Sequence, residues 1–200
     1  ALKGLKGNAS YDKAQADIQH ERTRTYNGIH DDGKFDRYDK GDGPEFTTLG
    51  KLGPLIGIKE PEHVMRLNNI LNDLGIDSAS IGSAVSWAME LYQRGIITRK
   101  ETGGLDLTWG NYEAIEKLFF MTARREGFGD TIADSNRAVD HGKYPKEALP
   151  YRMAVKGLFQ SDPHDSRILK AFALGLAVAT RGFDHLRNRP TLEINARVND

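Results

Sequence analysis

Apolar residues recur at helical spacing over residues 61–74, and this pattern constrains the fold more than any other feature of the chain. Pro61 suits the first position of a helix, and Gly75 directly follows the pattern, where glycine commonly ends a helix. Apolar side chains three and four residues apart lie on one helix face. The sequence therefore predicts a helix over 61–74 whose buried stripe consists of Val64, Leu67, Ile70, Leu71 and Leu74.

Similar patterns predict helices along most of the remaining chain. Asn111 or Thr108 is expected to cap one of them, and Asp130 another, since short polar side chains accept hydrogen bonds from the first free N–H groups of a helix. The segment 124–130 is expected to form the corner between these two helices. The predicted helices cover about 11–22, 80–94 (or 83–94), 110–126, 131–141 and 165–180.

Strand patterns are weak. The polar segment 31–43 predicts a loop to which Tyr38 adds an anchor, and 143–164, with three prolines, predicts a meandering loop. Two short links, 96–98 and 105–107, have an extended pattern, and Trp109 is expected to be a buried anchor. We predict an all-α, multi-helix orthogonal bundle and leave two helical subdomains open.

We expect three regions along the chain. They are a polar N-terminal segment and loop over 1–45, a helical domain over 46–142, and a loop with a C-terminal helix over 143–200, which would start a further helical domain.

Composition excludes several classes of function. Lys plus Arg and Asp plus Glu number 28 each, so no overall charge favours nucleic acid or an anionic membrane. No stretch approaches the about 18 to 20 apolar residues of a membrane span. The 200 residues include no cysteine, which excludes disulfides, thiol catalysis and an all-Cys iron–sulfur cluster within this chain. No histidines fall at paired metal spacing, so we assign no metal ligands. The absence of cysteine is compatible with a cytoplasmic protein, which is the location we expect.

The segment 181–187 (RGFDHLR) is the strongest candidate for a functional site. It places Arg181, Asp184 and His185 around Gly182 at the end of an apolar run, a costly mixture for plain packing. His185 can hold or release a proton near neutral pH. The structural alternative is an ion-pair network of these neighbours, with His185 at a helix end.

Two further segments carry candidate residues. Glu45 follows a Gly-Pro pair and could accept a proton, or simply begin a helix on the surface. Asn72, Gly75 and Asp77 lie in NDLGID, whose residues alone favour a helix stop followed by an N-cap.

Together these segments resemble a known family. GPEFTT at 43–48, LNDLGIDSASIG at 71–82 and RGFDHLR at 181–187 are similar, in this order, to the GPEYET, DxxGLD and RG-x-DHLR stretches of the tungsten-pterin aldehyde ferredoxin oxidoreductases. The resemblance implies helical second and third family domains. It also implies catalytic roles for Glu45 and His185 and cofactor contacts for Asn72, Gly75, Asp77, Arg181 and Asp184.

The chain departs from the family pattern in two places. Residues 24–31 are similar to the cysteine motif of the family with every thiol replaced, so we expect no [4Fe-4S] cluster in this chain. Asn72 stands where the family has Asp, which removes a charge and adds an NH₂ donor. The N-terminal pterin-binding domain and the second DxxGL motif of the family also have no counterpart here.

The resemblance implies part of an enzyme that oxidises aldehydes to carboxylic acids with a tungsten- or molybdenum-pterin cofactor and is not competent as this chain alone. Ferredoxin would accept the electrons, and ferredoxin or another subunit would carry the missing cofactor elements. Two alternatives remain: a non-catalytic relative that binds a partner or ligand, and a metal-free enzyme that reuses Glu45 and His185. We expect neither nucleic acid nor a membrane as a partner, and leave a homo-oligomer open.

Overall fold

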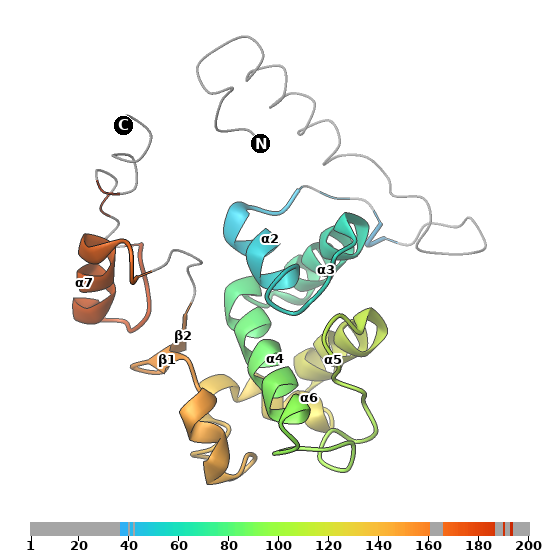
Figure 1. Cartoon of the computed structure of the whole chain (residues 1–200). Coiled ribbons are helices and arrows are strands. Elements are labelled where there is room, and N and C mark those ends of the chain that lie inside the picture. Colours follow the sequence, from blue (N-terminus) through green and yellow to red (C-terminus); the bar gives the residue numbers. More distant parts are fainter. Residues whose placement is uncertain are drawn as a thin grey trace.

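The computed structural model describes residues 37–39, 41, 43–160, 166–186, 190 and 193, and this part of the chain is mostly helical, as predicted (Figure 1). The predicted helix over 11–22 lies outside the described residues. The helices and strands, in chain order, are α2 (Phe46–Leu52), α3 (Pro61–Leu74), α4 (Ser78–Gln93), α5 (Tyr112–Arg124), α6 (Phe128–Ala133), the 3₁₀ helices η1 (Ser135–Arg137) and η2 (Lys146–Tyr151), β1 (Ala154–Val155), β2 (Leu158–Phe159) and α7 (Lys170–Val178).

Helix α4 lies at the centre of the main body. It contacts α2, α6, β2 and both 3₁₀ helices, while α3 packs against α2 and α5. Helices α2 and α4 cross closely at Gly82, where a Cβ atom would lie 2.8 Å from the carbonyl oxygen of Lys51. The core consists of apolar side chains from all these helices, among them the fully buried Leu67, Ile70, Val85, Ile115, Leu118 and Phe119.

The predicted stop and start between α3 and α4 are confirmed. Gly75 is left-handed, with φ of 67°, and ends α3 as its C-cap. The side chain of Asp77 then accepts a hydrogen bond of 2.7 Å from the backbone N–H of Ser80. Because Asp77 is the N-cap, α4 begins at Ser78, a little before the predicted start at residue 80 or 83.

Helix α5 follows the prediction, but Trp109 does not. Asn111 caps the helix by accepting from Ala114 N–H at 3.3 Å, and the expected corner with α6 forms. Trp109 was expected to be buried, yet it is 41% exposed. The neighbouring Gly110 N–H binds the carbonyl oxygen of Ile56 in the α2–α3 connection, and the indole N–H reaches Gln93 at the surface.

The predicted helix over 131–141 is wrong. Helix α6 begins earlier, after Gly127, and ends at Ala133, so Asp130 lies within its first turn and does not cap it. Ser135 has φ of 56°, a left-handed value that an α-helix cannot continue through. The chain is then turned back toward α6 by side-chain contacts.

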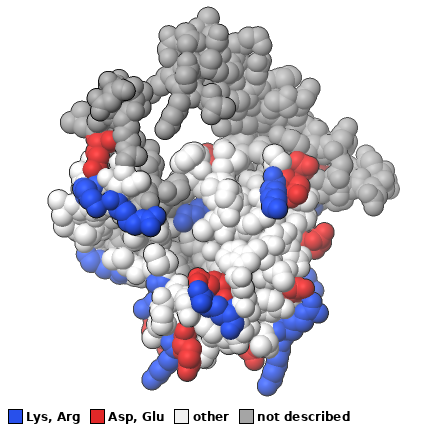
Figure 2. Space-filling model, viewed as in Figure 1, with Lys and Arg blue, Asp and Glu red and all other residues white. Residues whose placement is uncertain are grey.

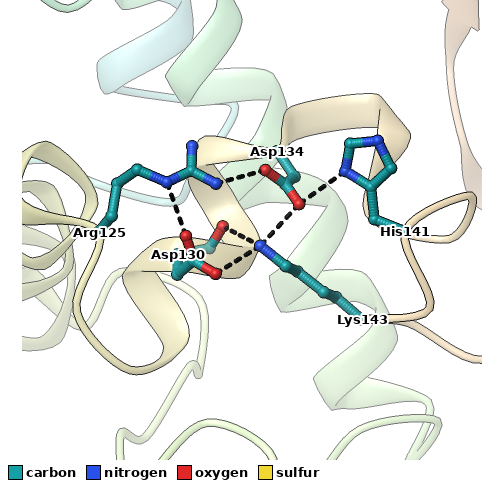
Figure 3. A network of polar contacts seen from close by, with 5 residues as sticks. All are labelled: Arg125, Asp130, Asp134, His141 and Lys143. Carbon is teal, nitrogen blue, oxygen red and sulfur yellow. Dashed lines mark hydrogen bonds and ion pairs between the residues drawn. The ribbon is translucent and has the colours of Figure 1, made fainter.

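Those contacts form one polar network (Figure 3). Asp134 accepts from Arg125 at 2.6 Å, from Lys143 at 2.6 Å and from His141 at 2.8 Å. Asp130 binds the same arginine and lysine. The network joins the end of α5, helix α6 and the segment after η1, and periodicity cannot reveal such contacts.

The predicted loop over 143–164 contains a β-hairpin. Strands β1 and β2 pair antiparallel, with Ala154 opposite Phe159 and Val155 opposite Leu158. A two-residue turn joins them, and each strand is too short to produce an alternating pattern. This sheet is the only strand pairing among the described residues, so the all-α class stands. The links 96–98 and 105–107 are not strands, although Ile97 and Leu107 are buried.

Helix α7 lies apart from the main body, on the left of Figure 1, and is shorter than the predicted 165–180. Leu169, Phe172 and Leu176 form a small separate cluster against which Phe183 packs. None of the helices that the structure describes has the length and apolar character needed to cross a membrane.

Candidate functional site

A pocket of about 810 Å³ brings together five of the seven predicted site residues. Its walls come from the N-termini of α2 and α4, the β1–β2 hairpin and the segment after α7. The five residues that line it are Glu45, Asp77, Arg181, Asp184 and His185.

The first wall is formed by two neighbouring helix N-termini. Glu45 is the N-cap of α2 and accepts from Thr48 N–H at 3.0 Å, as Asp77 does for α4. The hydroxyl groups of Thr48 and Ser78 lie 2.7 Å apart and link the two ends.

The segment after α7 forms the second wall around a buried carboxylate. Asp184 Oδ2 accepts from Arg181 Nε at 2.6 Å, and its Oδ1 accepts from Leu186 N–H at 3.0 Å. The bond from Leu186 N–H, followed by the Arg181 guanidinium, holds the pKa of Asp184 below its usual range. The ion pair foreseen as the structural alternative is thus present. His185 also lines the pocket, and its ring stacks on Phe172 at a centroid distance of 6.2 Å.

The hairpin forms the third wall. Gly182 has φ of 110°, and a Cβ atom there would lie 2.3 Å from the carbonyl oxygen of Val155, so only glycine allows this approach. Lys156 Nζ donates a hydrogen bond of 3.0 Å to the carbonyl oxygen of Ala179 at the end of α7. These two contacts hold the RGFDHLR segment against the hairpin, with His185 facing the pocket.

Sequence reasoning missed the residues of the hairpin, Lys156, Leu158 and Phe159, which line the pocket. The region was expected to be a loop, and its residues form no motif. The Lys-Gly pair at the turn was the only local signal, and it was too weak to identify a hairpin.

The remaining two predicted residues lie elsewhere. Gly75 lines a second cavity of about 410 Å³ between α4, α5 and α6, which also includes Arg125. Asn72 is exposed near the end of α3 and is not among the described residues that line either cavity. Ser80 lines both cavities, so the start of α4 separates them.

Within the described residues, neither the surface charge nor the potential metal-ligating side chains indicate a further binding site. Figure 2 shows acidic and basic side chains side by side on the visible face, without a large area of one sign. No group of three potential metal-ligating side chains occurs within the described ranges. His63 stacks on Tyr112 at 3.9 Å, and His141 belongs to the network of Figure 3.

Comparison with known proteins identifies the family. Residues 18–199 match the family model described as aldehyde ferredoxin oxidoreductase, domains 2 & 3. The chain is 34% identical over 149 residues to the tungsten-containing aldehyde ferredoxin oxidoreductase of Pyrococcus furiosus, a match that covers 74% of the chain. It is 38% identical over 154 residues, or 72% of the chain, to the WOR-like subunit of an aliphatic sulfonate oxidoreductase of the same organism.

These matches place the chain in the aldehyde ferredoxin oxidoreductase family, as the three sequence segments predicted. The similarity covers only 24% of the length of each of these relatives. The chain therefore corresponds to a helical portion of a much larger family architecture.

Proposed function

We propose that this chain forms the helical part of an aldehyde oxidoreductase that works with a tungsten- or molybdenum-pterin cofactor, and that the 810 Å³ pocket is where its residues meet the substrate. One observation carries the proposal. Glu45, near one end of the described chain, and His185, near the other, line the same pocket together with Asp77, Arg181 and Asp184. Two titratable groups that converge on a cavity lined in part by apolar side chains are typical of an active site.

The residues present fit a pterin in part. Asp77 supplies carboxylate oxygens that can accept from the N–H edge of a pterin, and Arg181 can donate to anionic or carbonyl oxygens. Asn72 and Gly75 do not line this pocket, so the proposed pterin contacts reduce here to Asp77, Arg181 and Asp184. Gly75 would contribute by ending α3 so that Asp77 can cap α4.

The chain does not fit a [4Fe-4S] cluster, because its 200 residues include no cysteine to supply thiolates. The cluster would therefore be held outside these 200 residues, by another subunit or by another part of a longer polypeptide, and would pass electrons to ferredoxin. A cytoplasmic location is part of the same proposal.

The proposed chemistry of the chain is proton transfer. When bound, the metal-pterin group supplies the two-electron oxidation of the aldehyde. Glu45, exposed at the α2 N-terminus, would accept a proton as water adds to the carbonyl carbon. His185, which is half-buried and lines the same pocket, would donate a hydrogen bond to the aldehyde oxygen. Asp184 and Arg181 would hold the backbone on either side of His185 in place.

The test is metal analysis and an aldehyde assay on the protein purified with its bound partners from the cells that make it. Near-stoichiometric tungsten or molybdenum, with aldehyde-dependent reduction of a one-electron dye, supports the proposal. Glu45→Gln and His185→Asn should each lower kcat by about 10² to 10⁴-fold. Glu113→Gln, on the exposed side of α5, is the matched control and should leave the rate unchanged.

The non-catalytic alternative predicts a different result. A folded protein that lacks tungsten and molybdenum and gives no aldehyde oxidation would refute the proposal and favour a scaffold that kept the pocket for a partner or ligand. Activity without either metal, abolished by the same two variants, would favour the metal-free enzyme.

A further inference from the structure

Lys156 occupies a position where lysine is locally unfavourable. It is the first residue of the two-residue turn between β1 and β2, and both turn residues, Lys156 and Gly157, have positive φ, of 51° and 85°. Such turns favour Asn, Asp or Gly, because a left-handed backbone is unfavourable for most other residues. A strained residue beside a cavity is a reason to look for a function of its side chain.

The charge of Lys156 is not matched by a carboxylate. Its hydrogen bond to the Ala179 oxygen is to a neutral carbonyl, and no ion pair of Lys156 occurs in the described part of the chain. The other cation of the pocket, Arg181, forms an ion pair with Asp184. Lys156 is thus the pocket-lining cation that remains available to a ligand.

The carboxylates of the pocket are already bound elsewhere. Glu45 and Asp77 accept from the N–H groups of their own helices, and Asp184 from Arg181 and Leu186 N–H. Glu45 and Asp77 belong to the helix wall, while Lys156 belongs to the hairpin wall together with the apolar Leu158 and Phe159. The pocket therefore has an acidic wall and a separate wall with one cation beside apolar surface.

We propose that Lys156 is a specificity-determining residue that binds the anionic group of a short aliphatic substrate, a carboxylate or a sulfonate, while the alkyl part lies on Leu158 and Phe159. An ammonium group recognises such oxyanions as a point charge with three donors. This inference deepens the proposed function: an aldehyde bound in this way would carry a negative charge at the end remote from its carbonyl group.

The experiment measures binding and not turnover. The ¹⁵N-labelled 200-residue chain is titrated with propane-1-sulfonate, with butyrate, and with methyl propyl sulfone, a neutral molecule of nearly the same shape as the sulfonate. The amide signals of residues 156–159 and 182–186 report on the pocket. We expect both anions, but not the sulfone, to shift these signals, and the tighter anion identifies the preferred group.

Two variants test the role of the side chain. Lys156→Asn removes the charge with a residue that suits left-handed backbone, so the hairpin should stay folded, and it should raise the Kd of the anions at least about tenfold. Lys156→Arg keeps the charge and should largely restore binding. Lys146→Gln removes an exposed lysine in η2, outside the pocket lining, and should have no effect.

The inference is overturned if the wild-type chain binds neither anion, if the sulfone binds as well as the sulfonate, or if Lys156→Asn binds the anions unchanged. The experiments can refute this inference without refuting the proposed function, and the reverse. A protein that lacks tungsten and molybdenum, oxidises no aldehyde and binds propane-1-sulfonate through Lys156 would support this inference and refute the proposed oxidoreductase. A tungsten-containing, aldehyde-oxidising protein without anion binding would do the reverse.

Discussion

Replacing Asp134 with Asn tests whether the network of Figure 3 holds α6 and the following turn in place. The Asp134 side chain is 9% exposed and receives three donors, from Arg125, Lys143 and His141. A hydrogen bond to a charged group contributes about 1.5 to 3 kcal/mol when it is buried, and an exposed ion pair about 0.2 to 1. Because the side chains of the three donors are 53%, 24% and 47% exposed, values near the exposed limit apply to each contact.

The sum is a loss of about 2 kcal/mol in the free energy of unfolding, which lowers the Tm of a chain of this size by about 4 to 8 °C. Thermal unfolding followed by circular dichroism measures it. The control is Asp140→Asn, whose carboxylate is 60% exposed and lies 3.4 Å from Arg152, and which should change stability by less than about 0.5 kcal/mol. Equal Tm values for the two variants would refute the argument.

The same variant predicts a pH dependence. Hydrogen bonds from Lys143, then from Arg125 and His141, hold the pKa of Asp134 below its ordinary value of 3.8. A depressed carboxyl pKa stabilises the folded state above pH 3.8, and the stabilisation is lost as the pH falls below that value toward the folded-state pKa. The stability difference between wild type and Asp134→Asn should therefore shrink as the pH falls below 4. A difference that grows in acid would contradict this assignment.

Three further substitutions test the site and the core. Gly182→Ala should lower the free energy of unfolding by about 2 to 4 kcal/mol, because it adds left-handed strain and a clash with the hairpin. Gly142→Ala, at a glycine with φ of 73° and open space around it, is the control and should cost only about 1 kcal/mol. Equal shifts of the two urea midpoints would contradict the close approach of Gly182 to the hairpin. Arg66→Met removes one partner of the buried Asp39 and also the ion pair with Glu116. It should cost about 3 to 5 kcal/mol in urea unfolding, and a loss below about 1 kcal/mol would show that these contacts are not essential. Asp77→Ala should lower the free energy of urea unfolding by about 1 kcal/mol, because it removes the α4 N-cap. Asp77→Asn, which can still cap the helix, should retain most of the stability. Equal losses for the two variants would argue against capping.

Local signals in the sequence were sufficient for the helices with strong periodicity. Pro61, Gly75 and the stripe between them determined α3, and Asn111 determined the start of α5. The helix expected over 131–141 failed because Ser135 adopts a left-handed backbone that the side chains around Asp134 support. Those side chains come from segments that no local window includes.

For the candidate site, too, some features follow from local sequence and others depend on tertiary contacts. The sequence by itself determined the helical class, the family and the cap at Asp77, because caps and periodicity depend on neighbours within a few residues. Only the tertiary structure decided that His185 faces the pocket of Glu45, that Asn72 stays outside it, and that Lys156 joins it. Those outcomes depend on the approach of Gly182 to Val155 and on the link between Thr48 and Ser78, contacts between segments that are distant along the chain.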